Sequence, residues 1–145
     1  MNIKVKRVHN MAITPTRGTR GAAGYDLYYC DNNTLLIRPG ETKKLGTGVA
    51  YEIPEGYAGF VYARSGLSTK QGLRPANCVG VIDSDYRGEI MVALHNDSNE
   101  TRIVNYGERI AQIVIEEYVN YEITIEDDLS KTERGDGGFG STGIK

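Results

Sequence analysis

Apolar and polar residues alternate along Leu45-Gly46-Thr47-Gly48-Val49-Ala50-Tyr51-Glu52-Ile53, and the turn sequence Pro54-Glu55-Gly56 follows directly. A period of two residues is typical of a β-strand with one buried face. The same alternation returns in residues 57–63. We therefore predict two strands here, joined by a turn that lets the second fold back antiparallel on the first.

The same pattern extends outward over most of the chain. Further alternating runs occupy residues 3–6, 34–38, 90–94 and 110–115. Further turn signals occupy residues 38–41, 96–99 and 105–108. These turns predict hairpins. No window of a dozen residues has the apolar period of a helix, although residues 65–71 could form one short turn. The predicted fold class is all-β, and the pattern leaves both a sandwich and a barrel open.

Length and charge limit the classes of function. A chain of 145 residues fits one domain. Its 17 basic and 19 acidic residues give a net charge of −2 and a pI near 5.7, so no basic surplus is available to hold nucleic acid. We find neither the apolar segment of a signal peptide nor a membrane span of roughly 20 residues. We therefore expect a cytoplasmic protein with no nucleic-acid or membrane partner.

The cysteines and histidines are few. Cys30 and Cys78 are 48 positions apart, which favours two buried thiols in a reducing compartment over a disulfide. His9 and His95 form no pair at the spacing of metal ligands. A structural zinc site is therefore not expected.

Two segments in the first half of the chain carry groups suited to phosphate or metal chemistry. Ala22-Ala23-Gly24-Tyr25-Asp26-Leu27 places one acid at the start of a strand. The Asp26 carboxylate could hold water around a divalent cation, or it could simply cap a turn. In residues 63–68, Arg64, Ser65 and Gly66 follow a strand. This set could grip phosphate oxygens, and it could equally be an ordinary surface turn.

Two later segments interrupt apolar strands with polar side chains. In residues 77–91, Asp83 follows Val81 and Ile82. At the end of a buried run it could act as a general base, and the alternative is a turn residue. In residues 107–115, a turn leads into an apolar run, and Arg109 and Gln112 are the only long polar side chains inside that run. An inward amide needs a partner, which could be a ligand.

The C-terminal segment differs in composition from the rest. Residues 130–145 contain five glycines and no strand pattern, so we predict a β domain over residues 1–129 and a flexible tail over residues 130–145. Residues 134–143 combine Arg134, Phe139 and two hydroxyls with a backbone free to wrap anions. A disordered linker is the alternative, and Phe139 argues against it.

Taken in order, these five segments resemble the five motifs of the trimeric deoxyuridine triphosphatase (dUTPase) family over residues 22–143. The chain departs from the usual pattern at Ala63, where the family commonly has proline, and at the variable position Ser68. The resemblance implies an antiparallel jelly-roll-like β-barrel or sandwich and a homotrimer. It also implies active sites shared between subunits, each closed by a C-terminal tail.

The resemblance further implies hydrolysis of dUTP to dUMP and pyrophosphate by attack of water on the α-phosphate. This activity limits uracil incorporation into DNA and supplies dUMP for dTMP synthesis. Asp83 would polarise the water, and Mg²⁺ would bridge the phosphates, with Asp26 reaching it through water. The implied substrate-binding residues are Arg64, Ser65, Gly66, Asn77, Gly80, Val81, Ile82, Asp83, Tyr86, Met91, Gln112, Arg134, Phe139, Gly140, Ser141 and Thr142.

By motif position, residues 77–86 would form a hairpin whose main chain reads the uracil edge and excludes a 5-methyl group. Tyr86 would exclude a 2′-hydroxyl, and Phe139 would stack on the base. Other interpretations stay open: a deoxycytidine triphosphate deaminase-like enzyme, a catalytically silent nucleotide-binding subunit, and a general nucleoside triphosphatase. Intact candidate groups in each motif favour the dUTPase.

Overall fold

The computed structural model describes residues 1–138. The predictions made for Phe139, Gly140, Ser141 and Thr142 lie outside the described residues. Residues 1–138 form eleven strands and one short helix. The strands are β1 (Lys4–Arg7), β2 (Tyr25–Tyr28), β3 (Leu35–Ile37), β4 (Thr42–Gly46), β5 (Val49–Glu52), β6 (Tyr57–Tyr62), β7 (Leu73–Pro75), β8 (Gly80–Ile82), β9 (Met91–Asn96), β10 (Arg102–Val104) and β11 (Arg109–Glu117). The helix α1 (Ser65–Gln71) coincides with the predicted helical turn, and the all-β prediction is confirmed.

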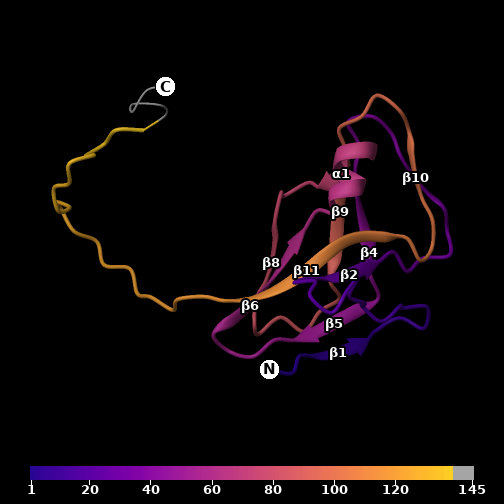
Figure 1. Ribbon diagram of the computed structural model, residues 1–145, viewed down its shortest axis with the longest axis horizontal. Helices are drawn as coiled ribbons and strands as arrows, with labels where there is room; N and C mark the ends of the chain where they lie inside the picture. Colours follow the sequence, from indigo (N-terminus) through magenta and orange to yellow (C-terminus); the bar gives the residue numbers. More distant parts are fainter. Residues whose placement is uncertain (139–145) are drawn as a thin grey trace.

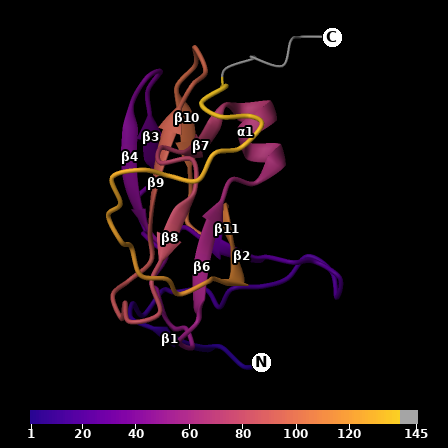
Figure 2. The same ribbon diagram turned by 90° about the vertical axis from the view of Figure 1, so that its left-hand side faces the viewer.

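Two sheets form the body of the molecule. One has the strand order β2-β11-β6-β8 and the other β4-β9-β7, while β1 pairs with β5 and β10 with β3. All of these pairs are antiparallel. The two sheets lie as separate layers in Figure 2, with β4 and β9 on one side and β6 and β11 on the other. This arrangement fits the predicted jelly-roll-like class.

The hairpin prediction is wrong. In the described part of the chain no strand pairs with the next strand in sequence. The turn at residues 54–56, for example, leads from β5, which pairs with β1, to β6, which pairs with β8 and β11. Turn residues fix where a chain reverses, but the buried faces of the strands decide which strands become neighbours. Each predicted turn therefore connects two strands that pair with different partners and not with each other.

The alternating run at residues 45–53 is also not one strand. It breaks between β4 and β5, where Gly48 has φ +70°. A Cβ at Gly48 would lie 2.7 Å from the Cβ of Ala12 and 2.8 Å from the Sγ of Cys30. Glycine is required here both by the backbone conformation and by this close approach. The break sends the chain from the β4-β9-β7 sheet to the β1-β5 pair.

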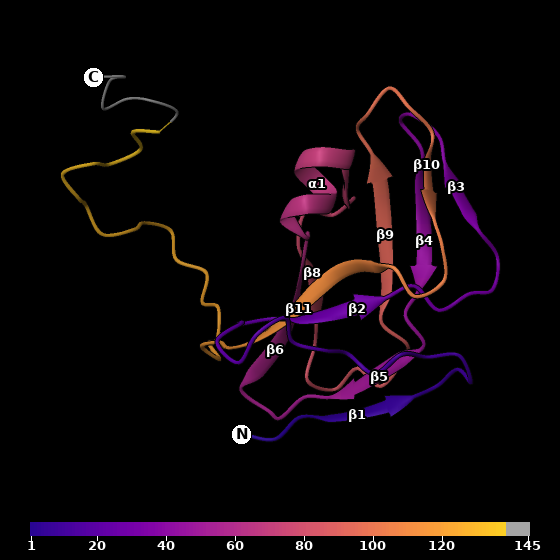
Figure 3. The ribbon, with the colours of Figure 1, turned by 45° about the vertical axis from the view of Figure 1, so that its right-hand side comes forward.

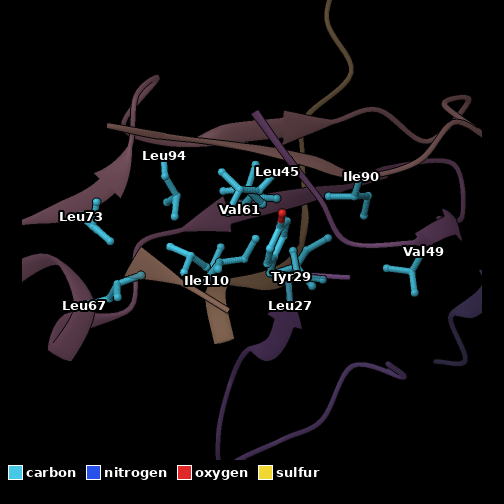
Figure 4. Close-up of a cluster of buried hydrophobic side chains, with 14 of the residues drawn as sticks. Leu27, Tyr29, Leu45, Val49, Val61, Leu67, Leu73, Ile90, Leu94 and Ile110 are labelled. Atoms are coloured by element: carbon cyan, nitrogen blue, oxygen red, sulfur yellow. The ribbon is translucent and has the colours of Figure 1, made fainter. Parts of the chain in front are cut away.

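The hydrophobic core lies between the two sheets. Leu45 and Leu94 come from one sheet, and Leu27, Val61 and Ile110 from the other. Figure 4 shows these side chains converging from opposite layers. All five are between 0% and 4% exposed, so this dry core fixes the two sheets against each other and holds the strand ends that carry polar residues.

Residues 118–138 form no strand or helix and run away from the sheets (Figures 1 and 3). Within them Val119, Tyr121, Ile123 and Ile125 are 78%, 74%, 81% and 96% exposed. These four residues alternate with polar ones, which is the pattern of a half-buried strand. We call residues 119–125 the exposed arm, and it has no partner strand among residues 1–138. No helix among these residues is long and apolar enough to cross a membrane.

Candidate active site

Three neighbouring strands bring together a carboxylate, an amide and a guanidinium. Gln112 in β11 lies opposite Asp26 in β2 and opposite Tyr62 in β6, and Arg64 follows the end of β6. Arg64 Nε donates to Asp26 Oδ1 at 2.8 Å. Arg109 Nη1 donates to Asp26 Oδ2 at 3.2 Å. The nearly buried Asp26 carboxylate, 12% exposed, is thus held between two guanidinium groups.

Gln112 finds its partner within the protein. Its Nε2 donates to the main-chain carbonyl of Ala63 at 2.9 Å. A Cβ at Gly24 would lie 2.9 Å from Gln112 Oε1, so glycine lets β2 approach this amide. Gln112 therefore fixes the chain one residue before Arg64. This bond engages one of the two N–H donors of the amide within the protein, and the contact of Gln112 with a ligand stays a prediction.

Ser65 and Gly66 begin α1 and are exposed. The Ser65 carbonyl accepts hydrogen bonds from Ser68 Oγ and Thr69 Oγ1. These bonds stabilise the first turn behind Arg64. The Ser65 and Gly66 backbone is thereby presented next to the Arg64 guanidinium.

A pocket of about 200 Å³ lies between β8 and β9. The predicted binding residues among its lining are Asn77, Gly80, Val81, Ile82 and Met91. In β9, Asn96 N–H donates to Glu41 next to β4, whereas Ala93 accepts from Ala76 on the opposite side. Main-chain groups alternate sides along an antiparallel strand. The N–H and C=O of Met91 therefore point away from β4, toward the pocket.

Asp83 follows β8, but β8 is not a buried run as expected. β8 is an edge strand of its sheet, its residues are half-buried or exposed, and Asp83 is exposed. The carboxylate meets no hydrogen-bond donor within residues 1–138. Tyr86 is 44% exposed, and its OH donates to the Glu89 carbonyl at 3.0 Å. Residues 77–86 contain β8 alone rather than two paired strands.

Within one chain, Asp83 and Arg64 are far apart. Ile82, next to Asp83, lies opposite Gly59 in β6, and Arg64 follows Gly59 by five residues, about 16 Å of extended chain. Arg134 is also remote from Asp26 and Arg64. Its Nε donates to the Gly137 carbonyl at 2.9 Å, within the C-terminal segment itself. The structure thus assembles two half-sites and does not join them.

The two cysteines are free, in agreement with the sequence, but only Cys30 is buried. Burial raises the pKa of the Cys30 thiol, and the nearby Glu89 and Asp31 charges add to the shift. Cys78 is exposed and has φ +63°. It lies in the turn before β8, where the chain bends around the pocket. The prediction of two buried thiols is therefore wrong for Cys78.

The fold and the two half-sites together define the class of protein. It has two packed antiparallel sheets, a small pocket of about 200 Å³ beside β8 and a separate arginine–carboxylate cluster that could hold an anion. The dUTPase family model matches residues 10–143. The chain belongs to the dUTPase family. It is 49% identical over 143 residues to the deoxyuridine 5′-triphosphate nucleotidohydrolase of Nautilia profundicola, covering 99% of each chain.

Solved structures agree with this assignment. The dUTPase of Staphylococcus bacteriophage 80alpha with dUpNHpp superposes with a TM-score of 0.86 at 31% identity, covering 99% of each chain. A mutant dUTPase from phage phi11 of S. aureus has a TM-score of 0.82 at 25% identity, covering 90% of this chain and 100% of that one. The latter structure describes the coordination of a structural Mg(II) ion.

Proposed function

We propose that this protein is a dUTP diphosphatase, which hydrolyses dUTP to dUMP and pyrophosphate. The observation that carries the proposal is that a dUTPase-family chain combines a small pocket, which has a free main-chain edge, with an arginine–carboxylate cluster. The Met91 main chain would meet the uracil edge, and Tyr86 would pack against the deoxyribose. The activity would limit uracil incorporation into DNA and supply dUMP for dTMP synthesis.

Asp83 would polarise the water that attacks the α-phosphorus. Its exposed carboxylate has no protein donor among residues 1–138, so both oxygens stay available to a water molecule. A positioned general base contributes about 10²–10⁴ in rate. The proton would move from the water to an Asp83 carboxylate oxygen as the oxygen–phosphorus bond forms and the pyrophosphate leaves.

The phosphate chain would be held by Arg64 with the Ser65 and Gly66 backbone, and Gln112 would keep that segment in place through Ala63. In the closed site Arg134, Gly140, Ser141 and Thr142 would cover the phosphates and Phe139 would stack on the base. Preorganised positive groups of this kind stabilise charge that develops on transferring phosphoryl oxygens. The Nε-anchored guanidinium of Arg64 supports this assignment.

The Asp26 site fits an outer-sphere contact to Mg²⁺. A carboxylate has about four lone-pair positions, and the two guanidinium groups occupy one on each oxygen. The remaining positions could accept hydrogen bonds from metal-bound water. Residues 1–138 contain no cluster of three acidic, histidine or cysteine ligands, so the direct ligands would be phosphate oxygens and water. Bound Mg²⁺ would neutralise phosphate charge.

We further propose a homotrimer with shared active sites. The distance along β6 between Arg64 and the partner of Ile82 supports a site whose two halves come from different subunits. The exposed arm supports it independently, because four apolar side chains in strand alternation need a surface to cover them. A groove of about 530 Å³ is available for the arm of a second copy. It is lined by Ile3, Val5, Tyr25, Tyr51, Ile113 and Ile115, among others.

β1 borders this groove and pairs only with β5 among the described strands, so its other edge could accept an added strand. A cytoplasmic location belongs to the same proposal and is supported by the two free thiols, which suit a reducing compartment.

The direct test is pyrophosphate release by the purified full chain with Mg²⁺ and, separately, dUTP, dTTP, dCTP and UTP. Release from dUTP alone, without ammonia, is expected. Ammonia release from dCTP would instead indicate a deaminase, and release from every nucleotide would indicate a general triphosphatase. Binding of dUTP with no product would indicate a silent regulatory subunit.

A further inference from the structure

We propose that Arg109 is a positioning residue for the reaction, which acts on Arg64 through the Asp26 carboxylate. The inference rests on the proposed function, because there Arg64 holds the phosphate chain. Arg109 itself is 48% exposed and contacts the cluster only through Asp26 Oδ2. Three observations carry the assignment: the register of β11, a bulge in that strand, and the charge balance around Asp26.

The strand register places Arg109 on the face of the sheet that carries Asp26. Asp26 and Tyr28 are two residues apart in β2, so their side chains point to the same face. Gln112 lies opposite Asp26, and Arg109 lies opposite Tyr28. Because opposed residues of an antiparallel pair share a face, all four side chains lie on one side of the sheet.

A β-bulge makes this arrangement possible. Arg109 and Gln112 are three positions apart, and in a regular strand such residues point to opposite faces. The pairing of β11 with β2 slips between Arg109 and Ala111, so Ile110 is an extra residue. Ile110 and Ala111 are consecutive, yet both are buried, at 1% and 0% exposure. Without the slip Arg109 would point toward the core, so the bulge redirects its side chain onto Asp26.

The charge balance explains what Arg109 does for Arg64. One carboxylate shared between two guanidinium groups leaves the cluster with a formal charge of +1. Without Arg109, Asp26 and Arg64 would form a neutral pair, and Arg64 would attract an anionic ligand less strongly. Arg109 also fixes Asp26 Oδ2 at 3.2 Å while Oδ1 anchors Arg64 Nε at 2.8 Å.

This anchoring defines where the remaining donors of Arg64 point. The contact with Asp26 uses Nε, and within residues 1–138 neither terminal nitrogen of Arg64 meets an acceptor. A planar guanidinium held by Nε presents its two terminal nitrogens as a fixed fork. This is the geometry that binds phosphate oxygens in a bidentate manner. Arg109 thus sets the orientation of that fork through the Asp26 carboxylate.

The test compares Arg109→Gln and Arg109→Lys with Arg102→Gln as the matched control. Arg102 also pairs with a carboxylate, Glu100 at 3.1 Å, but on β10, outside the cluster. We measure kcat/KM for dUTP and the Kd of the non-hydrolysable analogue α,β-imido-dUTP with Mg²⁺, each at a temperature where circular dichroism shows the variant folded. Arg109→Gln should lower kcat/KM and raise Kd, each by about 10-fold. Arg109→Lys should recover part of the loss, and Arg102→Gln should match the wild type.

A double-mutant cycle with Arg64→Gln separates positioning from a merely structural role. If Arg109 acts mainly through Arg64, adding Arg109→Gln to the Arg64→Gln protein should raise Kd by clearly less than the roughly 10-fold expected in the wild-type background, the remainder being the effect of the lost charge itself. A full 10-fold additional loss would overturn the proposal, and so would unchanged binding in Arg109→Gln. If that variant does not fold, Arg109→Lys enters the same cycle. A wild type that binds the analogue but releases no pyrophosphate would refute the proposed function alone, because the Kd cycle still decides the role of Arg109. A wild type that does not bind would refute both.

Discussion

Arg64 Nε and Asp26 Oδ1 are 2.8 Å apart, and this contact joins two segments 38 positions apart in the chain. Asp26 lies on β2 and Arg64 follows β6, with β11 between them in the sheet. The contact therefore spans a strand whose own side chains, Gln112 and Arg109, support both partners. The Asp26 carboxylate thus has a role inside the protein as well as the proposed one toward metal-bound water.

Replacing Asp26 should reveal its proposed contact with metal-bound water. In Asp26→Asn one oxygen becomes an amide donor and the negative charge is lost. We expect the Mg²⁺ concentration for half-maximal dUTP hydrolysis to rise about 10-fold, as is typical when an outer-shell contact to a metal is removed. Activity is titrated with Mg²⁺ at saturating dUTP. Arg64→Gln is the control, since it lowers nucleotide affinity but keeps the Asp26 carboxylate and its bond to Arg109. An unchanged Mg²⁺ requirement in Asp26→Asn would contradict a contact between Asp26 and the metal.

Asp83→Asn should abolish most of the activity without destabilising the protein. The carboxylate is exposed and accepts no hydrogen bond within the described residues, so its loss removes no internal contact. We expect kcat to fall by about 10²–10⁴, with the midpoint of thermal unfolding unchanged. Asp85→Asn, an exposed acid two positions away, should keep full activity. Equal losses in the two variants would mean that Asp83 is not the base.

Gly80→Ala should narrow the pocket between β8 and β9. An added Cβ would lie 3.3 Å from the Cβ of Val61 and 3.4 Å from Nδ2 of Asn77, both of which line the pocket. One methyl group in a fitted site changes specificity by about 10-fold or more, so we expect KM for dUTP to rise about 10-fold. The control is Gly18→Ala, where an added Cβ meets nothing within 4 Å. Identical KM values for dUTP in the two variants would mean that the uracil ring does not bind in this pocket.

The strands were predictable because their apolar residues alternate, but their pairing was not. β5 and β6 follow each other with a turn between them, yet they belong to different sheets. Pairing depends on which faces meet across the core, and that is a property of the whole chain. The exposed arm is the converse case. Its alternating apolar residues are visible in the sequence, but it was not predicted, because the glycines after Leu129 mark a stronger change in composition.

The candidate site shows a similar limit. Short motifs identified Asp26, Arg64 and Gln112, which the fold does bring together. The partnership of Arg109 with Asp26 joins residues 83 positions apart and depends on the bulge at Ile110. A bulge adds one residue to the strand and leaves no distinct composition, so a sequence pattern does not reveal it. The separation of Asp83 from Arg64 likewise follows only from the register of β6 with β8.

The two cysteines should differ in reactivity. The thiolate is the reactive form, and burial raises the pKa of Cys30, so a smaller fraction of Cys30 is ionised near neutral pH. Iodoacetamide should label Cys78 at least about 10-fold faster, as measured by mass spectrometry of timed digests. Cys30 labelling should accelerate as pH rises toward its raised pKa, and also in urea. A Cys78→Ser protein that is labelled as fast as the wild type would contradict this order.

The exposed arm should hold the oligomer together. Ile123→Asn with Ile125→Asn removes two apolar side chains that are 81% and 96% exposed in the single chain, so the folded subunit should lose little stability. The loss should fall on the contact with a second copy, because that contact is where these side chains would be buried. We expect light scattering to give the mass of a trimer for the wild type and of a monomer for the double variant.

The matched control lies on the opposite face of the same arm. Glu122→Gln with Thr124→Asn changes two polar residues between the apolar ones, and a strand packed by its apolar face leaves them outside. This protein should remain a trimer and keep its activity, whereas the isoleucine variant should lose activity as it dissociates, because Asp83 and Arg64 then no longer meet. Mixing Asp83→Asn protein with Arg134→Ala protein should restore some activity, because the proposed shared sites take Asp83 and the tail that carries Arg134 from different subunits. A monomeric wild type with full activity would refute shared sites, since one chain would then bring Asp83 to Arg64 by itself.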